Sequence, residues 1–223
     1  NTIFSIPMHP YLSKNDQDII ISTIKIFIKK NNFILNHSIF SFILTGIGTV
    51  LLLLQNIIIA RFFGDNLFGI FSFITNLFLI LSIFAKFGIE HFSLKNIPII
   101  LSSDNKSRLK GFYYFSYLRT LLFSFLVCIL FLPFILYGNY SNIQLSFIYI
   151  ALWFIIRMIV ELFSFQLQAL NKTISSRLVF HIFPPLLSII LFFINSRFNI
   201  YENSLNLLFE VLLIGYAISF FFI

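Results

Sequence analysis

The feature that most constrains this chain is a series of long apolar segments separated by short polar turns. The first runs from Ser38 to Ala60 without a charged residue, and the second begins at Leu67. A helix needs about 20 apolar residues to cross the roughly 30 Å hydrocarbon core of a bilayer. Of the residues in this chain, 59% are hydrophobic and 10% are charged, whereas soluble domains hold about 45–50% and about 25%. The pattern therefore predicts an all-α polytopic membrane protein.

Six transmembrane helices are expected from the apolar pattern. Their predicted bounds are 38–60, 67–92, 111–137, 143–170, 178–194 and 203–223. The sixth segment is still apolar at Ile223, so we expect this helix to be truncated there and the protein to continue. Residues 32–223 are thus predicted to form one transmembrane helix bundle. Gly46 and Gly48 predict close helix approach in the first span, and Pro184-Pro185 predicts a kink in the fifth.

Basic residues are divided unequally between the two sets of connections. One set and the N-terminal segment hold Lys14, Lys25, Lys29, Lys30, Lys95, Lys106, Arg108, Lys110, Lys172 and Arg177, whereas the other holds only Arg61 and Arg197. Because Lys and Arg concentrate in cytoplasmic loops, we expect a cytoplasmic N-terminus and an outward-facing turn from Arg61 to Gly69. This distribution also accounts for the net charge of +7 without a nucleic-acid partner.

Charged residues inside the expected spans are the strongest candidates for function, since a charge at the bilayer centre costs about 2.5–3.5 kcal/mol on insertion scales. Arg157 and Glu161 are four residues apart, so they share a helix face and are predicted to pair. Arg119 and Glu210 are further candidates for a substrate cavity, together with Arg61 at the mouth of the outward turn. Inward-facing arginines suit an anionic substrate such as a diphosphate.

A purely structural interpretation of these charges stays open. The arginines could form structural ion pairs or extend to the membrane interface. Lys86 and Glu90 are expected near the solvated cytoplasmic end of the second span. His181, in the fifth span, could bind a polar headgroup or a neighbouring carbonyl.

Motifs for bond-making chemistry are missing from the sequence. It contains no phosphate-binding glycine loop, no His/Cys cluster with metal-ligand spacing and no nucleophile elbow. The one cysteine, Cys128, lies in an apolar run and cannot form an internal disulfide. We therefore expect no metal, no cofactor and no enzymatic activity.

The first 31 residues differ from the rest in being polar and punctuated by proline. Ser13-Lys14-Asn15-Asp16 has the pattern of a capping box and predicts a helix start. The segment Ile6-Pro7-Met8-His9-Pro10-Tyr11-Leu12-Ser13, with Asp16-Gln17-Asp18, resembles the C-terminal tail of the DegT/DnrJ/EryC1/StrS sugar aminotransferases. The catalytic parts of that family, its Schiff-base lysine and pyridoxal-phosphate pocket, have no counterpart here, so the resemblance implies no activity. The alternative is a cytoplasmic juxtamembrane amphipathic helix.

A second resemblance concerns the turn after the first span. Ala60, Arg61, Gly64, Phe68 and Gly69, followed by Phe87-Gly88-Ile89, resemble the Wzx-type polysaccharide flippases of the MOP superfamily. The turn Leu167-Gln168-Ala169-Leu170-Asn171-Lys172 also looks like that family's cytoplasmic turn, with Asn171 where a glycine is common. In this resemblance Gly64, Phe68, Gly69 and Gly88 form the turn and packing motif.

The flippase resemblance implies that the chain is the first of two lobes of a transporter in the bacterial inner membrane. Such proteins move undecaprenyl-diphosphate-linked oligosaccharide outward for O-antigen and lipopolysaccharide assembly. Arg119, Arg157 and Glu161 would then contact the diphosphate or the sugar. The implied partners are this lipid-linked oligosaccharide, membrane lipids, and the polysaccharide polymerase and chain-length machinery.

Three other functions remain open. A MATE-like small-molecule exporter would need acidic residues deep in the outer half of this lobe, where the spans hold few. A membrane glycosyltransferase or polysaccharide polymerase would need a catalytic acid on a substantial outward loop, and the short first turn offers only Asp65. An inactive fusion or gene remnant is the third alternative.

Overall fold

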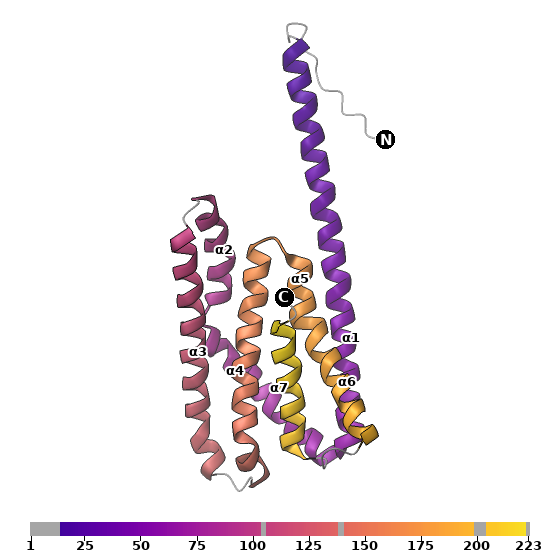
Figure 1. Ribbon diagram of the computed structural model, residues 1–223, viewed down its shortest axis with the longest axis vertical. Helices are drawn as coiled ribbons and strands as arrows, with labels where there is room; N and C mark the ends of the chain where they lie inside the picture. The colour runs from indigo at the N-terminus through magenta and orange to yellow at the C-terminus, as the bar shows by residue number, and fades with distance from the viewer. Residues whose placement is uncertain (1–13, 104–105, 138–140, 199–203, 222–223) are drawn as a thin grey trace. The chain divides into compact units, whose positions relative to one another are not determined.

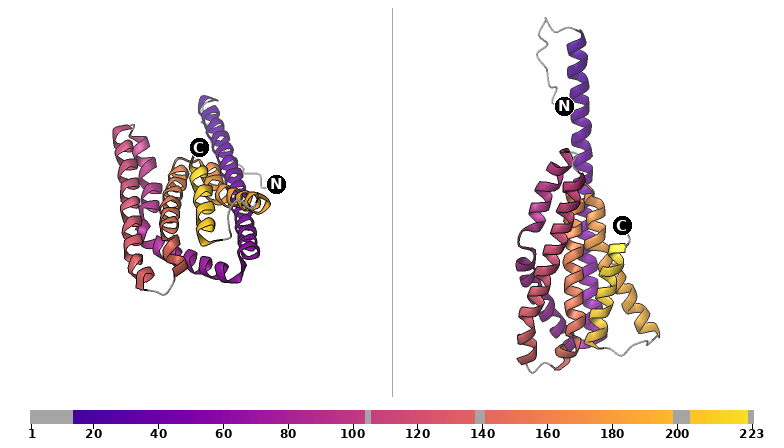
Figure 2. Two further views of the ribbon diagram at one scale, coloured as in Figure 1. Left: turned by 60° about the horizontal axis from the view of Figure 1, so that its bottom comes forward. Right: turned by 60° about the vertical axis from the view of Figure 1, so that its left-hand side comes forward.

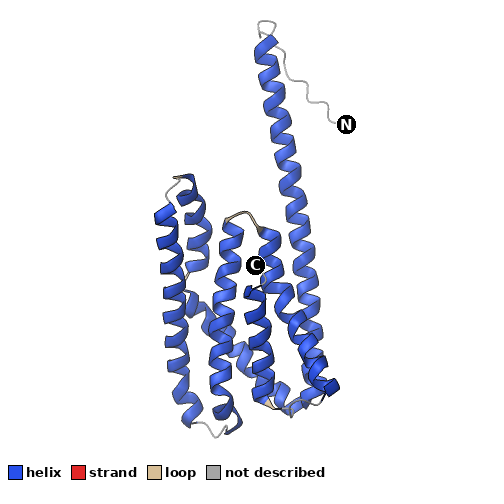
Figure 3. Ribbon diagram, in the orientation of Figure 1, coloured by secondary structure: helices blue, strands red, loops and turns tan. Residues whose placement is uncertain are grey.

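The computed structural model in Figure 1 describes residues 14–103, 106–137, 141–198 and 204–221, and side chains mainly over 38–103, 106–131, 147–195 and 204–220. The described part of the chain is all-helical, as predicted, with only short turns between the helices (Figure 3). Its elements are α1 (Lys14–Lys86), α2 (Ile89–Ser102), α3 (Lys106–Tyr137), α4 (Ser141–Ala169), α5 (Thr173–Arg177), the π-helix η1 (Leu178–Ile182), α6 (Phe183–Phe198) and α7 (Leu205–Phe221).

The chain divides into two compact units, residues 1–40 and residues 41–223. The described part of the first unit is the beginning of α1, which starts at Lys14, directly after the Ser13 of the expected capping box. Ser13 itself, and the aminotransferase-like segment before it, lie outside the described residues. All that follows concerns the second unit.

Four stretches are long and apolar enough to cross a membrane: Ser38–Lys86, Lys106–Phe131, Phe147–Ala169 and Thr173–Asn195. A shorter apolar helix covers Leu205–Phe220. These helices are those of a multi-pass membrane protein. The first stretch has 49 residues, about twice the length of one crossing, and it is divided by a break. That the chain has six membrane spans stays a prediction.

Gly64 makes this break within α1. Its φ of 76° and ψ of 170° belong to a region that is essentially restricted to glycine. The helix runs through Phe63 and resumes at Asp65, so the turn is a single residue and not the longer polar turn predicted. The expectation that Gly69 helps to form the turn is wrong, because Gly69 is helical and a Cβ there would have open space around it.

A second break follows at Phe87-Gly88, where φ is 42° and 76°. Both residues are in the left-handed region, which ends α1 at Lys86 and lets α2 leave in a new direction. The predicted second span, 67–92, is therefore not one helix. The chain bends at Phe87-Gly88, just before Glu90, and Ile89 opens a separate helix, which continues to Ser102.

Within the second unit, α2 and α3 lie side by side, and α4 packs against both of them and against α7 (Figures 1 and 2). The part of α1 after Gly64 crosses α7, α4 and α3 in turn, as its ring contacts Phe71–Phe209, Phe78–Phe154 and Phe78–Phe131 show. The end of α2, the start of α3 and the α4–α5 turn lie at one end of this unit (Figure 1). We call it the basic end, because the exposed Lys106, Lys110 and Lys172 belong to it.

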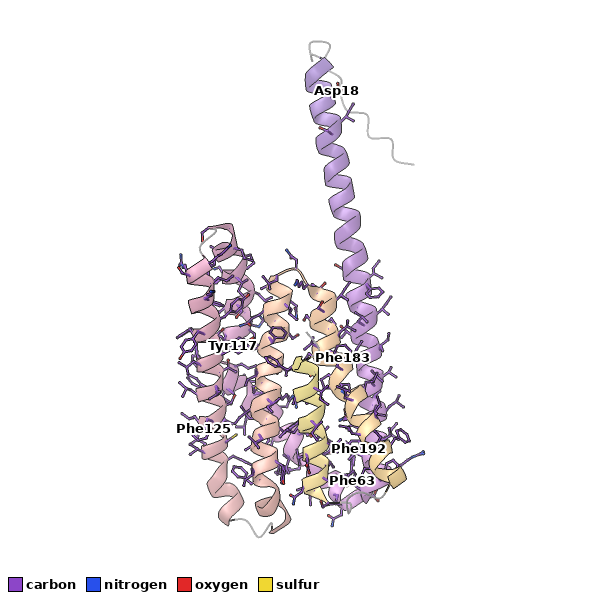
Figure 4. All side chains as sticks on the ribbon, in the orientation of Figure 1. Asp18, Phe63, Tyr117, Phe125, Phe183 and Phe192 are labelled. Atoms are coloured by element: carbon purple, nitrogen blue, oxygen red, sulfur yellow. The ribbon has the colours of Figure 1, made fainter. Side chains whose placement is uncertain are left out.

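Aromatic side chains fill the opposite end of the second unit. Phe63 meets Phe192 edge to face with ring centroids 5.7 Å apart (Figure 4), and Phe78 lies 4.6 Å from Phe154. Such ring pairs add about 0.5–1.5 kcal/mol each beyond the area they bury. This end of the bundle is therefore an aromatic core.

The irregularity predicted at Pro184-Pro185 takes the form of η1, the turn of π-helix directly before the prolines. Proline lacks the N–H that would bond the carbonyl four residues earlier, so the preceding turn widens. The carbonyl of His181 lies against Gly48 of α1, where a Cβ would come within 2.7 Å of the His181 Cβ and oxygen. Close approach at Gly48 is thus confirmed, whereas a Cβ at Gly46 would meet nothing within 4 Å.

Asn171 closes α4 at the basic end. Its φ is 60°, and the hydrogen bonds from Lys172 N to Leu167 O and from Asn171 N to Gln168 O, both 2.9 Å, form a Schellman motif. Asparagine tolerates this left-handed position better than most residues. It therefore fits this left-handed helix C-terminus.

Candidate functional site

Three charged side chains meet in the interior of the second unit. Lys86 Nζ lies 2.5 Å from Glu161 Oε1 of α4 and 3.1 Å from Glu90 Oε1 of α2. Their side chains are only 12–18% exposed. We call Lys86, Glu90 and Glu161 the central charge cluster.

The Phe87-Gly88 break explains why this cluster can form. It places Lys86 in the last turn of α1 and Glu90 in the first turn of α2. A cation at a helix C-terminus and an anion at a helix N-terminus are each stabilised by the unpaired backbone groups there. The break thus presents both charges to α4 from one point.

Glu161 of α4 shows how far the cluster lies from the end of a candidate membrane span. Glu161 is eight residues before Ala169, the end of its candidate span, which corresponds to about 12 Å along the helix. Charges buried at this depth are costly unless they are paired. Lys86 and Glu90 lie at helix ends but are largely buried, so the expectation that they are solvated is wrong.

Arg157 occupies a different environment from the one predicted. Its guanidinium lies 5.3 Å from the centre of the Trp153 ring, and its buried Nε has no hydrogen-bond partner. The ion pair expected with Glu161 is not formed, because Glu161 pairs with Lys86. Within the described part of the chain Arg157 has no carboxylate partner, although it lies near the middle of the span Phe147–Ala169.

Tyr216 of α7 extends this polar region. It contacts Trp153 through its ring, at 6.4 Å between centroids, and lies within electrostatic range of both Arg157 and Glu161. His181 of η1 also lies within electrostatic range of Glu161, and its Nε2 is 3.3 Å from Arg177 Nη1. Glu161 thus pairs with Lys86 and also interacts electrostatically with side chains of η1 and α7.

Polar contacts continue from the cluster toward the basic end. Gln166 Nε2 donates to Ser116 Oγ at 3.0 Å and joins α4 to α3. Ser164 and Ser176 share a 2.8 Å hydrogen bond between α4 and α5, and Gln168 Nε2 also donates to Ser176 Oγ. The interior is therefore polar between the cluster and the basic end, and aromatic on the other side.

The remaining predicted residues are not brought to the cluster. Arg119 lies on α3 with its guanidinium 5.5 Å from the Phe87 ring and 5.7 Å from the Phe123 ring. Arg61 is exposed, three residues before the Gly64 bend. Glu210 is half-buried, next to Phe209 of the aromatic core, and makes no ion pair with any described side chain. Phe68 packs on the aromatic core with its ring 6.4 Å from Phe71.

Lys86 and Glu90 are the functional candidates that sequence reasoning missed. The signal was present, since opposite charges four residues apart flank a Phe-Gly pair in an otherwise apolar stretch. No group of three or more metal-binding side chains occurs among the residues that the structure describes.

Comparison of the chain with protein-family models, with curated proteins and with solved structures gives no match.

Proposed function

We propose that this chain is the first lobe of a membrane transporter that moves a lipid-linked oligosaccharide with a diphosphate headgroup. The observation that carries the proposal is Arg157, a mid-span arginine without a counter-ion among the described residues. Ionisable residues inside membrane spans most often line a substrate or ion pathway. A bound anion would supply the charge that Arg157 lacks.

The broken helix supports the same function. Transporters commonly place their binding sites where membrane helices are discontinuous, since the free helix ends and nearby charges can contact a polar substrate. Here the Phe87-Gly88 break carries Lys86 and Glu90 to Glu161, one helical turn from Arg157. A diphosphate bound at Arg157 would compete with Glu161 for the nearby cations.

The substrate class comes from the resemblance to Wzx-type flippases and from the chemistry of arginine. The planar guanidinium binds phosphate oxygens with two parallel hydrogen bonds. The resemblance adds the undecaprenyl chain, the saccharide and the direction toward the outer leaflet. It also implies the bacterial inner membrane, and the distribution of Lys and Arg between the connections predicts a cytoplasmic N-terminus.

The test is complementation of a bacterial strain that lacks its own O-antigen flippase. The gene is expressed with its natural flanking sequence, and surface O-antigen is measured on gels of extracted lipopolysaccharide. Arg157→Gln should reduce export about tenfold or more, as expected for loss of a charged hydrogen bond, whereas the exposed Lys95→Gln on α2 should export normally. Membrane levels of each variant are compared by immunoblot. Normal export by Arg157→Gln would contradict the proposal.

A further inference from the structure

A shallow apolar groove of about 400 Å³ lies between the end of α1 and α3. It is lined by Phe84 and Phe87 on one side and by Phe123, Leu126 and Leu130 on the other. Phe84 is 62% exposed and Leu130 is 70% exposed, although both belong to stretches that are apolar enough to cross a membrane. The groove therefore opens toward lipid and not toward the interior of the bundle.

Arg119 stands at one end of this groove. It precedes Phe123 by one helical turn on the same face of α3, and its guanidinium lies over the rings of Phe87 and Phe123. No carboxylate among the described side chains pairs with it. The apolar groove thus ends at Arg119, a cation that forms no ion pair with a described carboxylate.

The position of Arg119 along α3 matches the level of lipid headgroups. Tyr113, Tyr114 and Tyr117 precede it, and tyrosines concentrate at the membrane interface. Arg119 is five residues beyond the exposed Tyr114, about 8 Å along the helix. Because helical side chains lean toward the N-terminus, its guanidinium extends back toward the basic end.

We propose that this groove binds one anionic phospholipid of the surrounding membrane, with an acyl chain along the groove and the phosphate on Arg119. From Arg119 to Phe131 the groove face of α3 extends about 18 Å, more than half of the roughly 30 Å hydrocarbon core. The exposed Lys106 and Lys110 lie on the same helix at the basic end and attract anionic headgroups.

Charge decides which lipid is preferred. A zwitterionic headgroup carries its own cation next to the phosphate, so it neutralises Arg119 less completely than an anionic one. Leu126 of α3, which lines the groove, is 50% exposed. This site lies outside the central charge cluster and does not depend on the proposed transport function.

The experiment is native mass spectrometry of the purified chain in detergent, with phosphatidylglycerol or phosphatidylcholine of identical acyl chains. The wild type should bind the first phosphatidylglycerol about tenfold more tightly, the scale expected of one charge-assisted contact. Arg119→Gln should abolish this preference, Arg119→Lys should keep it, and Lys95→Gln should leave it unchanged. Leu126→Trp fills the groove and should weaken the binding of both lipids.

Three results would overturn the proposal. One is equal binding of the two lipids by the wild type, and another is an undiminished preference in Arg119→Gln that melts like the wild type by circular dichroism. The third is displacement of bound phosphatidylglycerol by a polyprenyl diphosphate that is present at a lower concentration than the phosphatidylglycerol. This result would assign the groove to an isoprenoid lipid.

Discussion

At the scale of single residues, Lys86 is the side chain on which the central charge cluster depends. It is the one cation that contacts two carboxylates, Glu90 and Glu161, within the described part of the chain. Glu90 Oε1 is held by proximity to this charge, since it makes no hydrogen bond with any described group. The cluster therefore tolerates the loss of one carboxylate better than the loss of its cation.

Lys86→Met should lower the free energy of unfolding by about 3–5 kcal/mol, the cost of breaking a buried ion pair by removing one partner. Glu161→Gln should cost less, because Lys86 keeps Glu90 as a partner. The measurement is reversible unfolding in mixed micelles, with the exposed Lys95→Met as the matched control. Equal stability of Lys86→Met and Lys95→Met would show that the cluster is not buried as described.

At the scale of elements, the breaks that end the two straight parts of α1 lie at Gly64 and at Phe87-Gly88, and each redirects the chain. The third irregularity, η1, comes from Pro184 and Pro185. It brings the His181 carbonyl against the Gly48 backbone, so α1 and the π-turn approach more closely than side chains would permit. Helix contacts of this kind depend on the absence of a Cβ.

Gly48→Ala should therefore destabilise the second unit by about 1–3 kcal/mol, the usual cost of overpacking. The new Cβ would lie 2.7 Å from backbone and side-chain atoms of His181, and backbone gives way less easily than a flexible side chain. Gly46→Ala, two residues earlier, meets open space and should be neutral or stabilising by up to about 1 kcal/mol through helix propensity. The unfolding midpoints of the two variants in the same micelles provide the comparison, and an equal effect of both would refute the close contact.

At the scale of the whole second unit, the interior is divided along its length. Aromatic rings pack one end, whereas hydrogen-bonded Ser and Gln side chains lead from the central charge cluster to the basic end. A headgroup that entered from the basic end would meet polar side chains as far as Arg157 and a closed aromatic core beyond. The polar half of the interior is therefore the part that the proposed transport function would use.

Much of this architecture is visible in the sequence, because apolar length and glycine or proline positions act locally. Helical class, the bend at Gly64 and the irregularity at Pro184-Pro185 follow from such local rules. The ion pairing does not. Arg157 and Glu161 are four residues apart, so helical spacing favours their pairing, but a residue 75 positions away in the sequence takes that place.

The Lys86–Glu161 pair depends on tertiary packing. Lys86 reaches Glu161 only because Phe87-Gly88 ends α1 in the interior and α2 packs against α4, and nothing in the local pattern gives the position of that break relative to α4. The groove at Arg119 is equally invisible in sequence, because it needs α1 to cross α3 near Phe123. Long-range packing thus determines both candidate sites.

The partner of Glu161 is the most direct test of this account. Solid-state NMR of the protein in lipid bilayers can measure the dipolar coupling between ¹³C-labelled Glu side chains and ¹⁵N-labelled Lys or Arg side chains, with Lys86→Met and Arg157→Gln used to assign the signals. The account predicts a strong Glu–Lys coupling that disappears in Lys86→Met and no Glu161–Arg157 coupling of comparable strength. A Glu161 coupling to Arg157 that survives in Lys86→Met, without the lysine signal in the wild type, would contradict it.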